Sequence, residues 1–164
     1  MSASTSPTAT PPQGAAVRFP FPPALYIGPL AVALAVQYWL LPLSLPGGSP
    51  VTLVGVVLTV GGLIFSLSGT ATVLRHRTTV VPHRPVSALV TTGPFRISRN
   101  PMYTGHVISL IGAGLWAGSW WPIIVAPLCM LATYRLVIDA EEDYLTRLFG
   151  AEYGRYRARV RRWL

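Results

Sequence analysis

The side chains that could carry chemistry gather in three short stretches of the chain. They are the segment 75–100, the pair Arg135 and Asp139, and the run Glu141-Glu142-Asp143. The first stretch holds five of the thirteen arginines, and the other two hold four of the five acids. Opposite charges placed close together could hold a ligand that carries both a cationic centre and an anionic group. The alternative, which composition alone favours, is that these charges anchor helix ends and fix the topology of a membrane protein.

Three motifs overlap these stretches and follow one another along the chain. They are Leu89-Val-Thr-Thr-Gly-Pro-Phe-Arg-Ile-Ser-Arg-Asn-Pro-Met-Tyr-Thr-Gly105, then Glu141-Glu142, then Phe149-Gly-Ala-Glu-Tyr-Gly-Arg-Tyr156. Their order and spacing resemble those of the isoprenylcysteine carboxyl methyltransferases and their relatives, the phospholipid methyltransferases. The resemblance is clear from about Leu89 to Trp163 and weaker back to Gly69 and Thr70. It implies an all-helical membrane fold that binds S-adenosylmethionine without a Rossmann sheet.

The resemblance places the cofactor at the start of a helix that begins near residue 101. Asn100 is the expected N-cap and Pro101 the first helical residue, so that backbone N–H groups point outward and can bind an anion. Arg96 and Arg99 flank them and suit the carboxylate of the methionyl moiety. Relatives often carry histidine where Asn100 stands. Asparagine keeps the capping function but cannot titrate, so no acid–base role is assigned to it.

The paired glutamates are expected to complete the cofactor site from the other side. Glu141 and Glu142 can accept hydrogen bonds from the ammonium group or the ribose hydroxyls. Phe95 and Tyr103 can supply an aromatic wall for the adenine or the sulfonium cation. The predicted cofactor site consists of Phe95, Arg96, Arg99, Asn100, Pro101, Met102, Tyr103, Gly105, Glu141 and Glu142. No catalytic residue is assigned, and the candidates are Arg96, Arg135 and Glu142.

Several of these residues also have a purely structural interpretation. Gly93-Pro94 could simply form a turn, and Arg99 could extend toward lipid phosphates. Small residues repeated along a membrane helix permit close helix packing, which is the favoured role of Gly105, Gly112 and Gly114 and the default role of Gly69. Thr70 shares the weak similarity around Gly69, and close packing is its default as well.

The remaining polar residues and the single cysteine are predicted to have structural roles. His106 is expected to be a neutral imidazole hydrogen-bonded to a neighbouring helix. Arg135 and Asp139, four residues apart, most simply pair with each other, although they share a helical face with Glu142 and could line the same pocket. His76 and His83 lack metal-ligand spacing, and Cys129 is predicted to be a core residue.

The composition of the chain suits a membrane better than water. Of its 164 residues, 51% are hydrophobic and 11% are charged, and all basic residues are arginine, for a net charge of +8. This charge fits nucleic acid or an anionic membrane surface, and the long uncharged stretches favour the membrane. The first 23 residues are rich in Ser, Thr, Ala and Pro and predict a disordered tail rather than a signal peptide.

Uncharged stretches separated by turn residues predict about four transmembrane helices. A helix needs about 20 apolar residues to cross the hydrocarbon core. The predicted spans are 24–45, 51–74, 101–117 and 122–140, with Trp120 and Trp121 at the tip of the hairpin formed by the last two. The predicted fold is therefore an all-α polytopic membrane bundle.

The distribution of arginine predicts the orientation of the bundle. The turns at 46–50 and 118–121 carry no arginine, whereas the loop 75–100 and the tail 141–164 carry most of them. Cytoplasmic loops are enriched in basic residues, so both chain ends are expected to face the cytoplasm. The tail alternates arginines with Tyr144, Leu148, Tyr156 and Val160 and is expected to form an amphipathic helix along the inner leaflet.

These observations predict a membrane methyltransferase domain at 24–164 that uses S-adenosylmethionine. By resemblance to protein-S-isoprenylcysteine O-methyltransferase, it would methylate a carboxylate of an apolar or lipid-anchored acceptor that arrives from the bilayer. Phospholipid amine N-methylation, small-thiol S-methylation and a non-catalytic membrane role are the alternatives. Methyl transfer from a sulfonium requires no metal, and nucleic acid is not an expected partner. The oligomeric state is left open.

Overall fold

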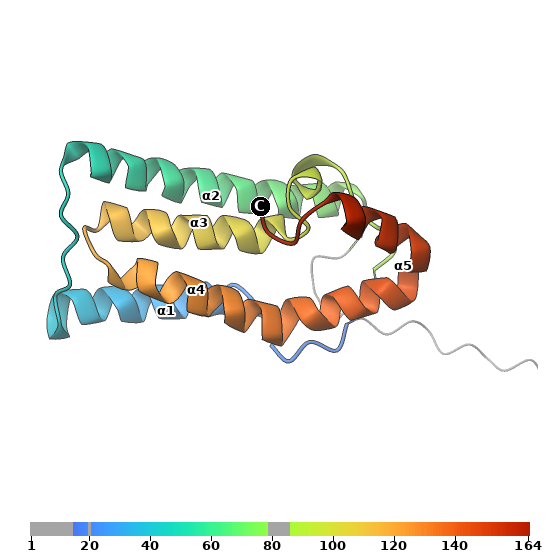
Figure 1. The fold of residues 1–164 in the computed structure, drawn as a ribbon, viewed down its shortest axis with the longest axis horizontal. Helices are drawn as coiled ribbons and strands as arrows, with labels where there is room; N and C mark the ends of the chain where they lie inside the picture. The colour runs from blue at the N-terminus through green and yellow to red at the C-terminus, as the bar shows by residue number, and fades with distance from the viewer. Residues whose placement is uncertain (1–14, 20, 79–85) are drawn as a thin grey trace, which may run out of the picture.

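The computed structural model describes residues 15–19, 21–78 and 86–164, and the regular elements in these ranges are all helices (Figure 1). The elements are α1 (Ala24–Ala35), a π-helical turn η1 (Val36–Leu40), α2 (Ser49–Arg75), a 3-10 turn η2 (Gly93–Arg96), α3 (Pro101–Trp116), α4 (Trp121–Thr133), a second π-helical turn η3 (Tyr134–Ile138) and α5 (Asp139–Arg159). The all-α prediction is confirmed for the described residues.

Glycines bring α2 and α3 into direct backbone contact along their length. A Cβ atom on Gly62 would lie 2.5 Å from the carbonyl oxygen of Gly105, and one on Gly105 would lie 2.4 Å from that of Gly62. Gly55 and Gly112 meet backbone atoms of the opposite helix in the same way. Small residues at these positions allow the helices to approach closely. Gly69 contacts Pro101 and Met102, so this seam fixes the start of α3 against α2.

Two stretches of helix are long and apolar enough to cross a membrane: Ser49–Arg75 and Trp121–Arg159. In the second stretch, α4, η3 and the first part of α5 follow one another without a break and form a rod. The apolar part of this rod ends near Ile138, and the charged residues that follow lie beyond it. The stretch Ala24–Leu40 is apolar but shorter, and α3 has 16 residues. Length and composition thus support two spans directly.

The first helix ends earlier than the predicted span 24–45. It stops at Leu40, and Leu41 adopts an extended conformation because a residue that precedes proline, here Pro42, disfavours the helical region. The extended segment pairs with the turn between α3 and α4, where Trp120 N donates to the Leu43 carbonyl oxygen at 3.0 Å. Gln37 Oε1 accepts from Leu43 N and from Ser119 Oγ, which ties η1 to the same turn.

The C-terminal segment differs from the predicted surface helix along the inner leaflet. Gly150 has a φ of 48°, a conformation that favours glycine, and α5 bends there. The last part of α5 then turns back toward the start of α3 (Figure 1). Tyr144 and Tyr156, expected to face lipid, are buried against the protein. The bend therefore makes this segment part of the bundle end.

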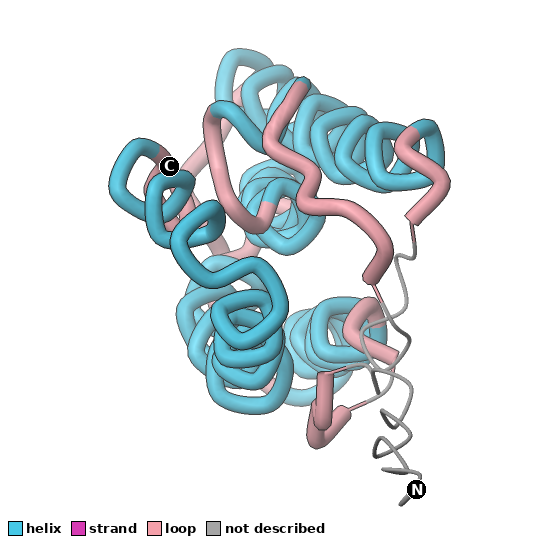
Figure 2. The backbone as a smooth tube through the Cα atoms, turned by 90° about the vertical axis from the view of Figure 1, so that its right-hand side faces the viewer, coloured by secondary structure: helices cyan, strands magenta, loops and turns pink. Residues whose placement is uncertain are grey.

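The predicted N-terminal tail is only partly described, because residues 1–14 and 20 lie outside the described residues. The described part packs on the bundle. Ala15 is 2% exposed, Arg18 N donates to the Leu136 carbonyl oxygen at 3.0 Å, and Val17 and Phe19 lie against the core formed by α1, α3 and α4. Cys129 is buried in this core. Figure 2 views the bundle from the end at which α5 bends.

Candidate functional site

A pocket opens at the end of the bundle where α3 begins and α5 turns back. Its walls come from the segment 86–90, from the loop that leads into α3, from the first turn of α3 and from both halves of α5. The lining residues are Ala15, Thr78, Val86, Ala88, Leu89, Val90, Phe95, Arg99, Asn100, Met102, Tyr103, Glu141, Glu142, Tyr144, Leu145, Tyr153 and Tyr156. The wall is thus largely aromatic and aliphatic, with two carboxylates and one guanidinium.

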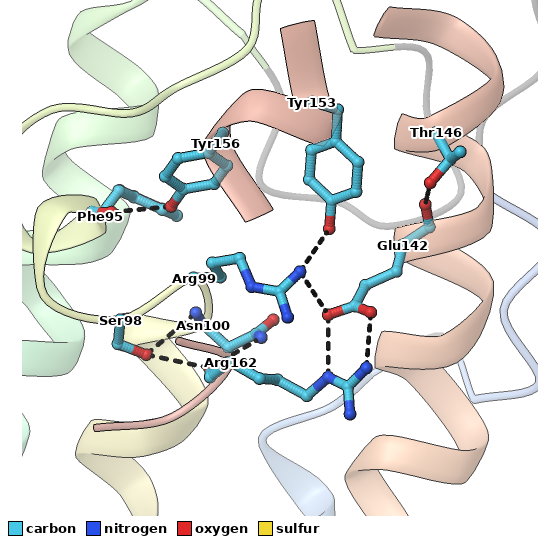
Figure 3. A network of polar contacts seen from close by, with 9 residues as sticks. All are labelled: Phe95, Ser98, Arg99, Asn100, Glu142, Thr146, Tyr153, Tyr156 and Arg162. Carbon is cyan, nitrogen blue, oxygen red and sulfur yellow. Dashed lines mark hydrogen bonds and ion pairs between the residues drawn. The ribbon is translucent and has the colours of Figure 1, made fainter. Parts of the chain in front are cut away.

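An arginine–carboxylate–arginine cluster forms the polar centre of this region (Figure 3). Glu142 is 7% exposed, and its two oxygens accept from Arg162 Nε at 2.9 Å and Nη2 at 2.7 Å. Arg99 Nη1 lies 3.2 Å from Glu142 Oε1 and also donates to Tyr153 Oη at 3.3 Å. Bidentate pairing of this kind fixes both the position and the charge of a carboxylate.

The surroundings keep Glu142 ionised. Burial acts to raise the pKa of this carboxyl, but the hydrogen bonds from Arg162 and the positive charges of Arg99 and Arg162 outweigh it, so that the pKa lies below its ordinary value. Glu142 therefore stays negatively charged beside the pocket at neutral pH, while the two guanidinium groups leave the cluster as a whole with a net positive charge.

Glu141, the next residue, lies in a different environment. It accepts a hydrogen bond from Tyr103 Oη at 3.4 Å. Burial raises the pKa of Glu141 to about 7, with the Tyr103 hydrogen bond acting against the rise and the charge of Glu142 adding to it. Adjacent carboxyl groups with different pKa values can take different chemical roles in one site.

The loop before α3 is shaped by a 3-10 turn and held by the C-terminal segment. Tyr156 Oη donates to the Phe95 carbonyl oxygen at 2.7 Å, and Ser98 is fully buried. The Asn100 side chain does not cap α3 as expected. Its Nδ2 instead donates to the Arg162 carbonyl oxygen at 3.1 Å, an acceptor that the returning chain supplies. Pro101 does occupy the first position of α3.

Seven of the ten predicted cofactor residues line this pocket: Phe95, Arg99, Asn100, Met102, Tyr103, Glu141 and Glu142. The other three lie outside it. Arg96 is exposed at the end of the 3-10 turn, Pro101 is packed against Gly69, and Gly105 serves the contact with α2. Of the three catalytic candidates, Glu142 lines the pocket and Arg96 does not.

The structure corrects the expected pairing of Arg135 with Asp139. Among the described residues no ion pair joins them, and neither lines the pocket. Both side chains are exposed. They do not meet because the π-helical turn η3 changes the angular spacing that would place residues four apart on one helical face. The Arg135 guanidinium lies 5.8 Å from the ring centroid of Tyr134 instead.

His106 also differs from expectation. His106 stacks on the Tyr26 ring of α1 at 5.1 Å between centroids, and its Nδ1 has no hydrogen-bond partner among the described residues. Its contact with the neighbouring helix is therefore aromatic stacking. His76, at the end of α2, donates from Nδ1 to the Thr72 carbonyl oxygen at 2.8 Å, and its Nε2 lies 3.3 Å from Thr92 Oγ1. His83 lies outside the described residues.

Sequence reasoning missed four residues that shape the site: Tyr153 and Tyr156, which belong to the third motif, and Ser98 and Arg162. The conspicuous tyrosine spacing of the third motif was a usable signal. No sequence signal pointed to Arg162, because it is one of several arginines in a basic tail and only the bend at Gly150 brings it to Glu142.

The residues present fit S-adenosylmethionine. The guanidinium of Arg99 is largely buried, it belongs to the pocket wall, and its Nε is a buried donor without a partner in the described part of the chain. Such a donor suits a ligand carboxylate. Glu142 supplies a carboxylate for a cationic group, and the aromatic side chains supply stacking surface.

Comparison with known proteins identifies the family of this chain. The family profile described as "Phospholipid methyltransferase" matches residues 51–152. Over 66 residues the chain is 38% identical to a protein of Haemophilus influenzae (strain ATCC 51907 / DSM 11121 / KW20 / Rd) described as "Uncharacterized protein", and the match covers 38% of this chain and 100% of that protein. No solved structure matches. The family match spans more than half of the chain and includes α2, α3, α4 and most of the pocket, and the protein therefore belongs to the phospholipid methyltransferase family of membrane methyltransferases.

Proposed function

We propose that this protein binds S-adenosylmethionine in the pocket between the start of α3 and α5 and transfers its methyl group to an apolar or lipid-anchored acceptor. The observation that carries the proposal is the pocket itself. It places the Arg99–Glu142 pair and a set of aromatic rings at the end of an apolar helical bundle. A zwitterionic cofactor with an aromatic base needs these groups in one place.

Each group in the wall has a part in holding the cofactor. Arg99 would bind the carboxylate of the methionyl moiety, and Glu142 would attract its ammonium group. Phe95 and Tyr103 would contact the adenine or the sulfonium. When bound, the cofactor supplies an electrophilic methyl group on sulfur. The chain aligns the acceptor with that methyl group and excludes water, because an in-line displacement depends mainly on positioning.

The first acceptor that we propose is a carboxylate, as in protein-S-isoprenylcysteine O-methyltransferase. An ionised carboxylate needs no base to attack a methyl group. Exposed apolar residues cover the outward faces of α1 and α2, so an acceptor with an alkyl or prenyl chain can reach the bundle from within the bilayer. The lipid bilayer and such an acceptor are thus the proposed partners. A small-thiol acceptor stays open, but no feature of the pocket favours it.

A phospholipid amine is the second candidate, and one feature of the pocket favours it. An ammonium group must lose a proton before it can accept a methyl group. Glu141 lines the pocket, and a carboxyl whose pKa is about 7 can accept that proton near neutral pH. The name of the matching family also refers to phospholipids.

A homologous series of acceptors tests the proposal. Prenylated and alkylated thioether carboxylates, ethanolamine lipids and thiols of matched chain length would be assayed for incorporation of labelled methyl groups in nanodiscs. Turnover should rise with chain length, because each buried methylene contributes about 0.8 kcal/mol. The headgroup that accepts methyl identifies the acceptor class. Highest turnover with a short water-soluble acceptor would contradict a lipid-like substrate, and no transfer to any acceptor by a protein that binds the cofactor would favour a non-catalytic role.

A further inference from the structure

We infer that Arg162, near the end of the basic tail, is a positioning residue that completes the cofactor site by holding the Glu142 carboxylate in place beside the pocket. The inference rests in part on the proposed function, because it concerns the same site. It adds a residue outside the matched range 51–152 and assigns a role to a tail that composition alone would explain as membrane anchoring.

Arg162 is held by contacts on three sides. Its guanidinium donates to both oxygens of Glu142, at 2.9 and 2.7 Å. The same guanidinium lies 4.7 Å from the ring centroid of Tyr134, which restricts its rotation. Its carbonyl oxygen accepts from Ser98 Oγ at 3.2 Å and from Asn100 Nδ2 at 3.1 Å. Figure 3 shows how these bonds converge from the loop, α5 and the tail.

One residue therefore fixes two separate parts of the pocket wall. Through its side chain it sets the orientation of the Glu142 carboxylate on α5. Through its main chain it sets the orientation of the Asn100 amide at the start of α3. Both of these side chains line the pocket. A surface arginine that only contacted lipid phosphates would make neither connection.

The charges around Glu142 explain why Arg162 matters more than its neighbours. Arg99 approaches from the loop before α3 with one nitrogen at 3.2 Å, and Arg157 acts from α5 through its charge alone. Glu141, Tyr134 and Tyr153 are the other titratable groups that lie nearest to the cluster. Burial opposes ionisation of Glu142, and Arg162 supplies the only bidentate hydrogen bonds to it among the described residues. Loss of Arg162 should therefore favour the protonated carboxyl.

The adjacent Arg161 offers a matched control. It carries the same charge and is exposed, and its contact with the site is made by the main chain, where its carbonyl oxygen accepts from Arg99 N at 2.9 Å. A side-chain substitution at Arg161 keeps that bond and removes the same positive charge from the tail. A general effect of tail charge would appear in both variants, and a specific effect on Glu142 would appear only at Arg162.

The ionisation of Glu142 can be measured without any cofactor. The sequence contains three glutamates, Glu141, Glu142 and Glu152, so carboxyl carbon resonances of glutamate-labelled protein in nanodiscs can be assigned by single Glu→Gln substitutions. Arg162→Met should raise the titration midpoint of Glu142 by about one pH unit or more. Arg162→Lys should give an intermediate value, and Arg161→Met should leave the midpoint unchanged. An unchanged Glu142 midpoint in folded Arg162→Met, or in folded Arg162→Lys if the methionine variant does not fold, would overturn the inference.

Calorimetric binding of S-adenosylmethionine at pH 5.5 and pH 7.5 gives the second readout. Arg162→Met should weaken binding by about tenfold or more, with a larger loss at the lower pH, whereas Arg161→Met should stay within about twofold of the wild type. Equal affinity in all three proteins would contradict the positioning role. Tighter binding by Arg162→Met would also contradict it, because the tail would then compete with the cofactor. Absence of binding by the wild type would instead contradict the proposed function, while the titration of Glu142 would still test the role of Arg162.

Discussion

Glu141 and Glu142 are neighbours in the chain but lie in opposite electrostatic environments. Glu142 faces two guanidinium groups, whereas Glu141 faces the Tyr103 hydroxyl. The pKa of the first carboxyl is lowered and that of the second is raised to about 7. Near neutral pH the pair therefore offers one fixed negative charge and one group that can gain or lose a proton. This division of roles suits a site that must bind a cation and also manage a proton.

The raised pKa of Glu141 predicts how stability depends on pH. The carboxyl binds its proton more tightly in the folded state than in the unfolded state. The folded state therefore loses stability as the pH rises from the unfolded pKa of 4.5 through the folded pKa of about 7. Glu141→Gln, which cannot ionise, should therefore be more stable than the wild type at pH 8, by about 1 kcal/mol or more. The advantage should be smaller at pH 5 and should vanish only below the unfolded pKa of 4.5. Thermal unfolding in detergent at both pH values measures this, and an advantage that is equal at both would show that Glu141 does not titrate as described.

The residues of the pocket illustrate what the sequence can and cannot predict at this scale. The first two motifs predicted Arg99, Asn100 and Glu142 as residues of the site, because these residues lie close to the places where their helices begin. Arg162 could not be identified, since its role depends on a bend twelve residues earlier at Gly150. The side chain of Asn100 was assigned to the wrong partner for the same reason, because its acceptor is supplied by the returning tail.

At the scale of elements, the α2–α3 seam sets the position of the site. Gly69 touches Pro101 and Met102, so the approach of the two helices fixes where α3 begins and where Arg99 and Asn100 precede it. The small-residue spacing in the sequence predicted close packing correctly at Gly105 and Gly112, which meet α2, and at Gly114, which meets α4 at Ile123. The end of the first helix was placed too late, because a count of uncharged residues does not register the effect of Pro42 on Leu41.

A pair of alanine substitutions tests the seam. In Gly62→Ala the new methyl group would lie 2.5 Å from the Gly105 carbonyl oxygen, so the helices must separate, at a cost of about 2 kcal/mol. In Gly61→Ala no atom lies within 4 Å, and stability should be unchanged or rise by about 0.5 kcal/mol. Unfolding in detergent compares the two. Equal stability of both variants would show that the helices are not in backbone contact.

At the scale of the whole molecule, we propose that four helical segments cross or enter the membrane with both ends of the chain in the cytoplasm. The family match and two long apolar helices make this a membrane protein, and the arginine-poor turns at one end of the bundle support the orientation. Neither the number of crossings nor their direction follows from length alone, since α1 and α3 are short for a full span.

Cysteine accessibility tests the orientation. In a Cys129→Ala background, Gly48→Cys should react with an impermeant maleimide on intact cells, because Gly48 is exposed in the turn before α2. Ser87→Cys, exposed at the opposite end beside the pocket, should react only after the membrane is opened. Reaction at position 87 with protection at position 48 would invert the orientation and place the pocket outside the cell.

The central claim is that the pocket between α3 and α5 binds S-adenosylmethionine, and calorimetry of the purified protein tests it most directly. The wild type should bind the cofactor, and Arg99→Ala or Glu142→Gln should weaken binding by about 1.5 to 3 kcal/mol, the range for loss of a charge-assisted hydrogen bond. Arg96→Ala, an exposed arginine three residues away that lies outside the pocket, should bind like the wild type. Equal affinity in the wild type, Arg99→Ala and Glu142→Gln would contradict the assignment of this pocket to the cofactor.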